Sequence, residues 1–131
     1  MSYLLDTNIC IAFLNQPKSG IGARFAKLGP DDVKLCSVVK GELLYGARHS
    51  TRVAENLEKL ARFFELFASI PFDDVAAEQY GVLCAQMRRA GTPLGGNDLL
   101  IASIALALDL TLVTRNQEEF RRVPGLRVQA W

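Results

Sequence analysis

The chain has 131 residues, of which 50% are hydrophobic and 22% are charged, and its formal net charge is +1 at pH 7. This length fits one globular domain, residues 1–131, with a core of its own, and the composition excludes intrinsic disorder. The near-neutral charge excludes attraction to nucleic acid through overall charge, so any such binding requires a local basic patch.

The predicted strands and helices alternate in the first half of the chain. Short apolar runs predict the strands, and Asp6 and Ser37 follow them with side chains that can cap helices. Proline and glycine between these units predict a loop. The predicted elements are a strand at residues 3–5 with a helix to about 14, a loop at 16–22, and a strand at 33–36 with a helix to about 48.

The second half continues the alternation, which favours an α/β fold with a central, mostly parallel sheet and helices on both faces. Apolar residues at steps of three and four predict a helix within residues 51–68, and Gly91 is expected to end the next helix. The remaining predicted elements are a strand at 70–72, a helix from 73 or 74 to 91, a loop at 92–97, a helix from 98 to about 108, and strands at 111–113 and 126–128.

The cysteines, Cys10, Cys36 and Cys84, are odd in number and widely spaced. They favour neither a disulfide framework nor a zinc site, and reduced cysteines fit a cytoplasmic protein. No charged leader precedes an apolar stretch, and no apolar run reaches the roughly 18 residues of a membrane span. We therefore expect a cytoplasmic protein without a membrane partner.

Asp6 stands at the carboxyl end of the first predicted strand, between two apolar runs. In open α/β sheets ligands bind at that edge. A helix cap is the alternative explanation, and the sequence leaves both open.

Two further acids lie on predicted apolar helix faces. Glu42 shares the stripe of Val38 and Tyr45, although it could point to solvent from the edge of that stripe. Asp98 shares a face with Ile101, although it could be an N-cap.

If these three acids converge at one end of the sheet, their charges repel and at least one pKa rises. A divalent cation removes the conflict, and ligands that are all oxygen favour Mg²⁺ or Mn²⁺ over Zn²⁺. Such ions clamp the attacking and leaving oxygens of a phosphoryl displacement. The implied chemistry is phosphodiester hydrolysis.

Four stretches of the chain form an ordered set: LLDTN at residues 4–8, SVVKGELLYGA at 37–47, GTPLGGNDLLIASIAL at 91–106 and LVTRNQEEFRRVPGLRV at 112–128. In this order and spacing they resemble the blocks of PIN-domain ribonucleases, and more closely those of the VapC toxins of bacterial toxin–antitoxin pairs. The resemblance runs over essentially the whole chain.

The resemblance implies a PIN fold and a magnesium-dependent endoribonuclease, with Mn²⁺ as a substitute ion. It also implies a cognate VapB-like antitoxin, a homodimer, and an RNA substrate for which tRNA is the first candidate and mRNA the next. By position, the family's acids are Asp6, Glu42 and Asp98, with Asp6 and Asp98 as direct metal ligands and Thr7, Asn97 and Thr114 as supporting residues.

The fourth acidic position departs from the family pattern, because Asn116 stands where many PIN nucleases carry aspartate. Glu119 or Glu118 could substitute, with Asn116 in support, since Glu119 lies one helical turn further on. Equally, Asn116 could cap a short helix with Glu119 reaching back to it. The number of resident ions therefore stays open: the site could hold two ions, or one ion with a second recruited by the RNA.

Arg115 is the residue that we expect to contact an RNA phosphate. His49, near the end of its helix, receives no catalytic role. Phe63, Phe64 and Phe67 have helical spacing, which favours a core or dimer contact over an RNA-stacking surface.

Two other functions compete with ribonuclease activity. Asn116 motivates a PIN-like module that binds RNA or antitoxin without cutting. A phosphatase with Asp6 as nucleophile is the third hypothesis, and Asn8 weakens it because such enzymes need a second aspartate there.

Overall fold

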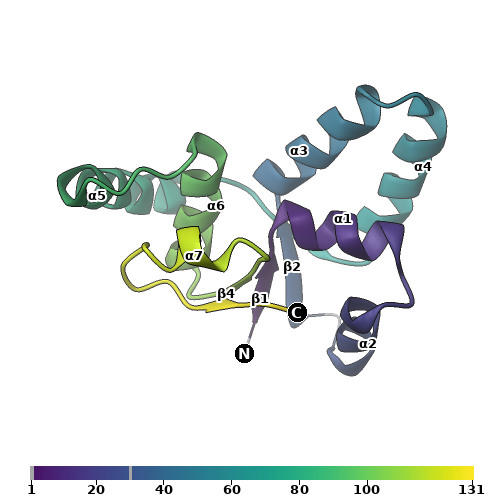
Figure 1. Ribbon diagram of the computed structural model, residues 1–131, viewed down its shortest axis with the longest axis horizontal. Helices are drawn as coiled ribbons and strands as arrows, with labels where there is room; N and C mark the ends of the chain where they lie inside the picture. The colour runs from purple at the N-terminus through teal and green to yellow at the C-terminus, as the bar shows by residue number, and fades with distance from the viewer. Residues whose placement is uncertain (1, 30) are drawn as a thin grey trace.

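The computed structural model describes residues 2–29 and 31–131. Within them, five parallel strands form one sheet in the order β3-β2-β1-β4-β5 (Figure 1). The predicted parallel α/β sheet is therefore confirmed. The strands are β1 (Tyr3–Leu5), β2 (Val33–Cys36), β3 (Ala68–Ile70), β4 (Thr111–Val113) and β5 (Val128–Gln129).

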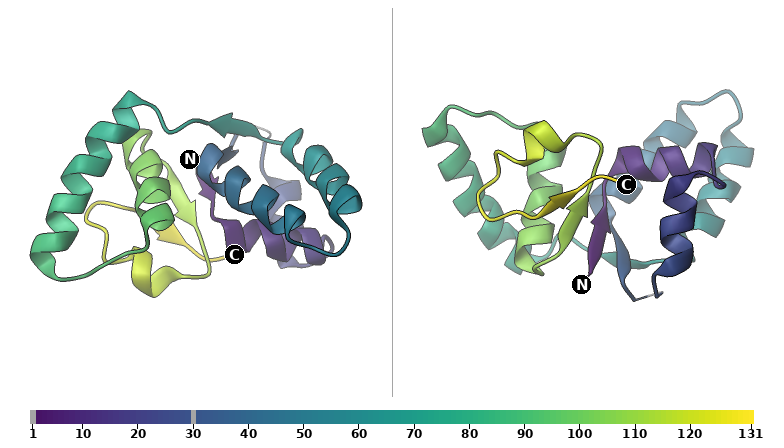
Figure 2. Two further views of the ribbon diagram at one scale, coloured as in Figure 1. Left: turned by 90° about the horizontal axis from the view of Figure 1, so that it is seen from above. Right: turned by 60° about the horizontal axis from the view of Figure 1, so that its bottom comes forward.

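Helices flank the sheet, with α1 to α4 on one side of the central strands and α5 to α7 on the other (Figures 1 and 2). None of the helices in the described residues combines the length and hydropathy needed to cross a bilayer. The helices are α1 (Thr7–Asn15), α2 (Gly20–Lys27), α3 (Ser37–Arg48), α4 (Val53–Phe64), α5 (Asp74–Ala90), α6 (Gly96–Ala107) and α7 (Gln117–Phe120).

The core is built on the central strands. Leu4 and Leu5 of β1 and Leu112 of β4 are 0% exposed, as expected for parallel strands that are covered on both faces. Phe63 is also buried, and its ring packs against Phe13 and Phe67. Of the core or dimer contact predicted for this phenylalanine, the core contact is confirmed.

Helix ends follow the capping signals in α5. Asp73 accepts a 3.0 Å hydrogen bond from the backbone N–H of Ala76, and Gly91 ends the helix with a φ of 67°. Ser37, in contrast, is wrong as a cap, because Cys36 precedes the first helical residue of α3 and makes no side-chain cap bond.

The predicted loop at residues 16–22 is wrong at its end, because α2 already begins at Gly20. Glycine has low helix propensity, so Gly20 and Gly22 conceal the helix in the sequence. A Cβ at Gly22 would collide with the backbone carbonyl of Pro17, so this glycine serves the close approach of α2 to the preceding turn. Burial of Ile21 stabilises the helix in its place.

Three other boundaries differ from the predicted ones. β3 lies two residues before the predicted strand, since Ala68 and Ser69 at this edge are exposed and give no apolar signal. Pairing with β2 sets its register, with Cys36 opposite Ile70. The helix predicted from residue 98 begins at Gly96, and the last strand lies at Val128–Gln129.

Candidate active site

Asp6 lies directly after β1, and its side chain is buried, with 4% exposure. Its Oδ1 accepts a 2.8 Å hydrogen bond from the Thr7 N–H, which caps α1. Its Oδ2 accepts a 2.7 Å hydrogen bond from Thr114 Oγ1. The helix cap that the sequence offered for Asp6 is therefore confirmed, and the same carboxylate lies at the carboxyl end of β1, so a role in ligand binding stays a prediction.

Thr114 reaches Asp6 because β1 and β4 are neighbours, with Leu5 paired to Val113. The next residue of each strand, Asp6 and Thr114, therefore meets the other at the same edge. Thr114 is fully buried, and its Oγ1 also accepts a 3.0 Å hydrogen bond from the Asn116 N–H. The end of β4 is thus tied to the end of β1.

Glu42 enters the same region from α3, where it is half-buried. Burial, and then the charge of Asp6, raise the pKa of Glu42, while the nearby Thr7 hydroxyl lowers it. Even so, Glu42 Oε1 and Thr7 Oγ1 are both buried without a hydrogen-bond partner among the described residues. Thr7 therefore lies near Glu42, and both oxygens remain available to a ligand.

Asp98, in the first turn of α6, completes the electrostatic link between the acids. Burial, followed by the charges of Asp6, Glu42 and Glu119, raises the pKa of Asp98 to about 6. Four carboxyl groups from distant parts of the chain therefore lie within electrostatic range of one another. Mutual repulsion is the expected consequence in the absence of a cation.

Glu119 joins the group from α7 through Asn116, whose Nδ2 donates a 2.9 Å hydrogen bond to Glu119 Oε2. Asn116 precedes α7, but its side chain makes no cap hydrogen bond. Asn116 is therefore the N-cap residue of α7 by position, and Glu119 reaches back to it as predicted, but the contact is to the side-chain amide and is not a cap hydrogen bond. Glu118 is exposed on the same short helix.

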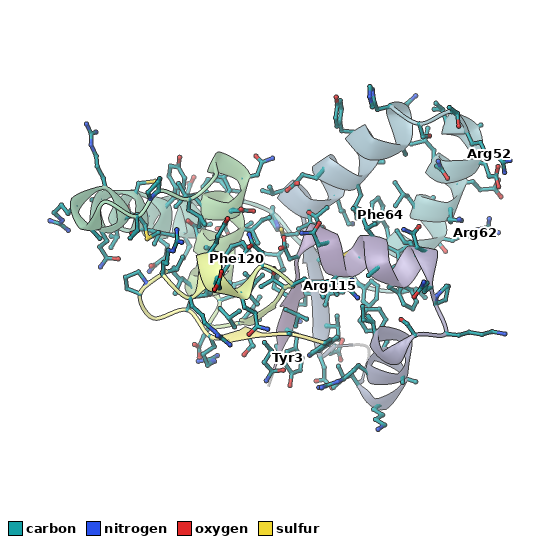
Figure 3. All side chains as sticks on the ribbon, in the orientation of Figure 1. Tyr3, Arg52, Arg62, Phe64, Arg115 and Phe120 are labelled. Carbon is teal, nitrogen blue, oxygen red and sulfur yellow. The ribbon has the colours of Figure 1, made fainter. Side chains whose placement is uncertain are left out.

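Two other predicted residues lie on the surface. Asn97 is exposed beside Asp98, and Arg115 is exposed between β4 and α7 (Figure 3). Arg115 makes no ion pair with any residue that the structure describes. His49 is exposed at the C-cap of α3 and stacks on Tyr45, for which the sequence predicted no functional role.

The acids are close without forming a ready-made metal site. No three His, Cys, Asp or Glu side chains of residues 2–29 and 31–131 are gathered tightly enough to hold an ion. The ion pairs within that part of the chain join other residues, so no arginine or lysine neutralises the cluster. An all-oxygen donor set, an unpartnered Glu42 oxygen and a raised Asp98 pKa fit a hard divalent cation.

The family model of the PIN domain matches residues 3–126. The chain belongs to the PIN-domain family. This PIN domain is 36% identical to Ribonuclease VapC2 of Rickettsia felis, over 100% of the chain and 98% of that protein. It is 34% identical to the tRNA(fMet)-specific endonuclease VapC of Salmonella typhimurium, with the same coverage. These relatives place the chain in the VapC family of ribonucleases, and PIN-domain nucleases depend on metal ions.

Solved structures agree with this assignment of the PIN domain. VapBC2 from Rickettsia felis, bound to a promoter DNA fragment, contains a chain with a TM-score of 0.95 and 36% identity, covering 100% of this chain and 99% of that one. DNA-bound VapBC from Salmonella typhimurium gives a TM-score of 0.95 at 34% identity, with coverage of 100% and 98%. The PIN fold implied by the sequence blocks is confirmed.

Proposed function

We propose that the whole chain is one PIN domain that cleaves RNA internally, with Asp6, Glu42, Asp98 and Glu119 around Mg²⁺. The observation that carries this proposal is the gathering of these acids at the edge where β1 and β4 end, with an unpartnered Glu42 oxygen among them. The raised pKa of Asp98 agrees with this arrangement. A cation would relieve the repulsion between these acids. Mn²⁺ has the same preference for oxygen ligands and is proposed as a substitute.

Each acid has a role that follows from its contacts. Asp6 and Asp98 hold the cation directly, and the hydrogen bonds from Thr7 and Thr114 fix the direction of the Asp6 carboxylate. Glu42, with an unpartnered oxygen, orients the attacking water. When bound, a divalent cation supplies Lewis-acid activation of water and stabilises the leaving oxygen.

The remaining supporting residues act at the edge of the cluster. Asn116 holds Glu119 through its amide. Arg115, exposed at the end of β4, contacts a phosphate of the RNA backbone. Asn97 supports the approach to Asp98 from the start of α6.

The relatives suggest the partners. One is named a tRNA(fMet)-specific endonuclease, and two solved relatives are VapBC assemblies. We therefore propose tRNA as the first substrate to test and mRNA as the second. A VapB-like antitoxin, a homodimeric state and action in the cytoplasm complete the proposal of a toxin in a type II toxin–antitoxin pair.

The test is cleavage of total RNA by the purified protein, with Mg²⁺ and with a chelator, followed by mapping of the cut ends. We expect the wild-type protein to cut RNA with Mg²⁺ and not with the chelator. We expect no cutting by an Asp6→Asn variant whose circular dichroism spectrum matches that of the wild type. Equal cutting by Asp6→Asn would overturn the proposal. Magnesium binding without any cutting would favour the non-cleaving binding module.

A further inference from the structure

A hollow of about 390 Å³ lies between α3 and α6, beside Glu42. Glu42 forms part of its wall, so the hollow adjoins the candidate active site. Its volume is many times the roughly 30 Å³ that one water molecule occupies in the liquid. The lining residues are Val38, Gly41, Glu42 and Tyr45 from α3, and Asn97 and Leu100 from α6.

Tyr45 presents an aromatic ring in this hollow, with 68% of the residue exposed. His49, one helical turn later, stacks on that ring with centroids 5.8 Å apart and an interplanar angle of 13°. Gly41, one turn earlier, has no side chain, and a Cβ there would meet nothing within 4 Å. The ring is therefore supported on its His49 side and open toward Gly41.

The other lining groups complement a flat heterocycle. Val38 and Leu100 supply apolar contact, and both are only partly buried. The exposed Asn97 carries an amide that both donates and accepts hydrogen bonds, as the edge of a nucleobase requires. A stacking ring, apolar walls and one bifunctional amide are the usual elements of single-stranded RNA recognition.

We propose that this hollow binds one nucleobase of the RNA, next to the phosphodiester that the acids cleave, with Tyr45 as the stacking surface. The proposal rests on the proposed ribonuclease function and adds a base-binding subsite to it. Continuity through Glu42 places a base in the hollow close to the reacting phosphate. Arg115 binds the backbone, whereas Tyr45 and Asn97 contact the base.

The test measures the binding of two fluorescent probes in a chelator, so that no cleavage occurs. One probe is oligoadenylate, and the other is an abasic sugar-phosphate oligomer of equal length and charge. Tyr45→Ala should weaken oligoadenylate binding about tenfold, as loss of one stacking contact does, and leave abasic binding unchanged. Tyr45→Phe should bind both probes as the wild type does.

Two further variants distinguish stacking from damage to the fold. Gly41→Leu places a side chain in the hollow and should reproduce the loss of oligoadenylate binding, without lowering the unfolding temperature because leucine favours helix. Leu44→Ala changes a 40% exposed residue of α3 that does not line the hollow, and should alter neither probe.

Several results would overturn the subsite. One is unchanged oligoadenylate binding by Tyr45→Ala, and another is an equal loss for both probes. A third is a Tyr45→Ala protein whose molar mass in light scattering changes while RNA binding does not, since a second copy of the chain would then cover Tyr45. These measurements need no cutting, so failure of the subsite and failure of the ribonuclease proposal are separate results.

Discussion

Thr114 Oγ1 donates a 2.7 Å hydrogen bond to Asp6 Oδ2, joining residues that are 108 positions apart in the chain. The same hydroxyl accepts from the Asn116 N–H, so its proton is directed toward the carboxylate. Because Thr114 and Asp6 are both buried, neither can exchange this bond for one to solvent without opening the sheet edge.

Thr114→Val removes this hydroxyl at nearly constant volume. We expect a loss of about 2 kcal/mol in the free energy of unfolding, because a buried carboxylate and a backbone N–H each lose a partner. Urea unfolding at constant pH measures it. Thr114→Ser keeps the hydroxyl and should lose clearly less. If the Thr114→Val variant were as stable as the wild type, the hydrogen bond would contribute nothing to stability.

Asp98→Asn should stabilise the cation-free protein at pH 7. The pKa of Asp98 is about 6 in the folded chain and 3.8 ordinarily. The folded state therefore binds more protons between these values, so this group's destabilisation grows as pH rises through the window and is complete above pH 6. After discounting for solvent screening, we expect a gain of about 1 kcal/mol.

The gain from Asp98→Asn should largely vanish near pH 3, below both pKa values, where the folded state and most of the unfolded state hold the proton. Urea unfolding at the two pH values tests this. Asp74→Asn is the matched control, because Asp74 is an acid in the first turn of α5 that contributes nothing to the raised pKa of Asp98. If the Asp98→Asn variant were less stable than the wild type at both pH values, the claim that the neighbouring acids repel Asp98 would be wrong.

Asn116→Ala should lower Mg²⁺ affinity and cleavage rate by about tenfold, in the range found when an outer partner that holds the acids of a metal site in place is removed. The reason is the lost 2.9 Å hydrogen bond to Glu119. Titration calorimetry and initial cleavage rates measure the two effects. In a Glu119→Gln background, the alanine should add little, since the pair acts as one unit. Full additivity of the two changes would refute that coupling.

Gly22→Ala should destabilise the protein by about 2 kcal/mol, because the added methyl group collides with the Pro17 carbonyl and overpacks the turn before α2. Gly20→Ala is the control, since a Cβ there meets nothing within 4 Å. Thermal or urea unfolding of the two variants gives the comparison. Equal stability of both would mean that the turn shifts freely.

Sequence predicted the central strands well because burial on both faces leaves a plain signal. Leu4 and Leu5 must be apolar, and so must Leu112 and Val113, whichever side they face. β3 lacked that signal because it lies at the edge, where Ala68 and Ser69 are exposed and only pairing with β2 sets the register. Helix α2 was hidden by glycines whose role is close packing.

Asp6, Glu42 and Asp98 could be singled out from the sequence because each interrupts an apolar pattern, whereas Glu119 and the partners Thr7 and Thr114 came from the resemblance to PIN-domain ribonucleases. The contact that Asn116 makes could not be predicted, since the choice between a cap and a bridge depends on side-chain angles that sequence spacing does not fix. Tyr45 was missed for a related reason. A tyrosine on a helical stripe predicts burial, and its 68% exposure arises from the packing of α3 against its neighbours.

The central position of β1 has a consequence for biosynthesis. The first strand to leave the ribosome needs β4 as a neighbour, and Asp6 needs the hydroxyl of Thr114, both of which are translated last but for the final segment. A nascent chain that is halted before that point therefore contains Asp6 but lacks β4 and the Thr114 hydroxyl that orients its carboxylate. With Asp6 in its proposed role, interrupted translation would release fragments unable to cut RNA, and only near-complete synthesis would produce an active nuclease.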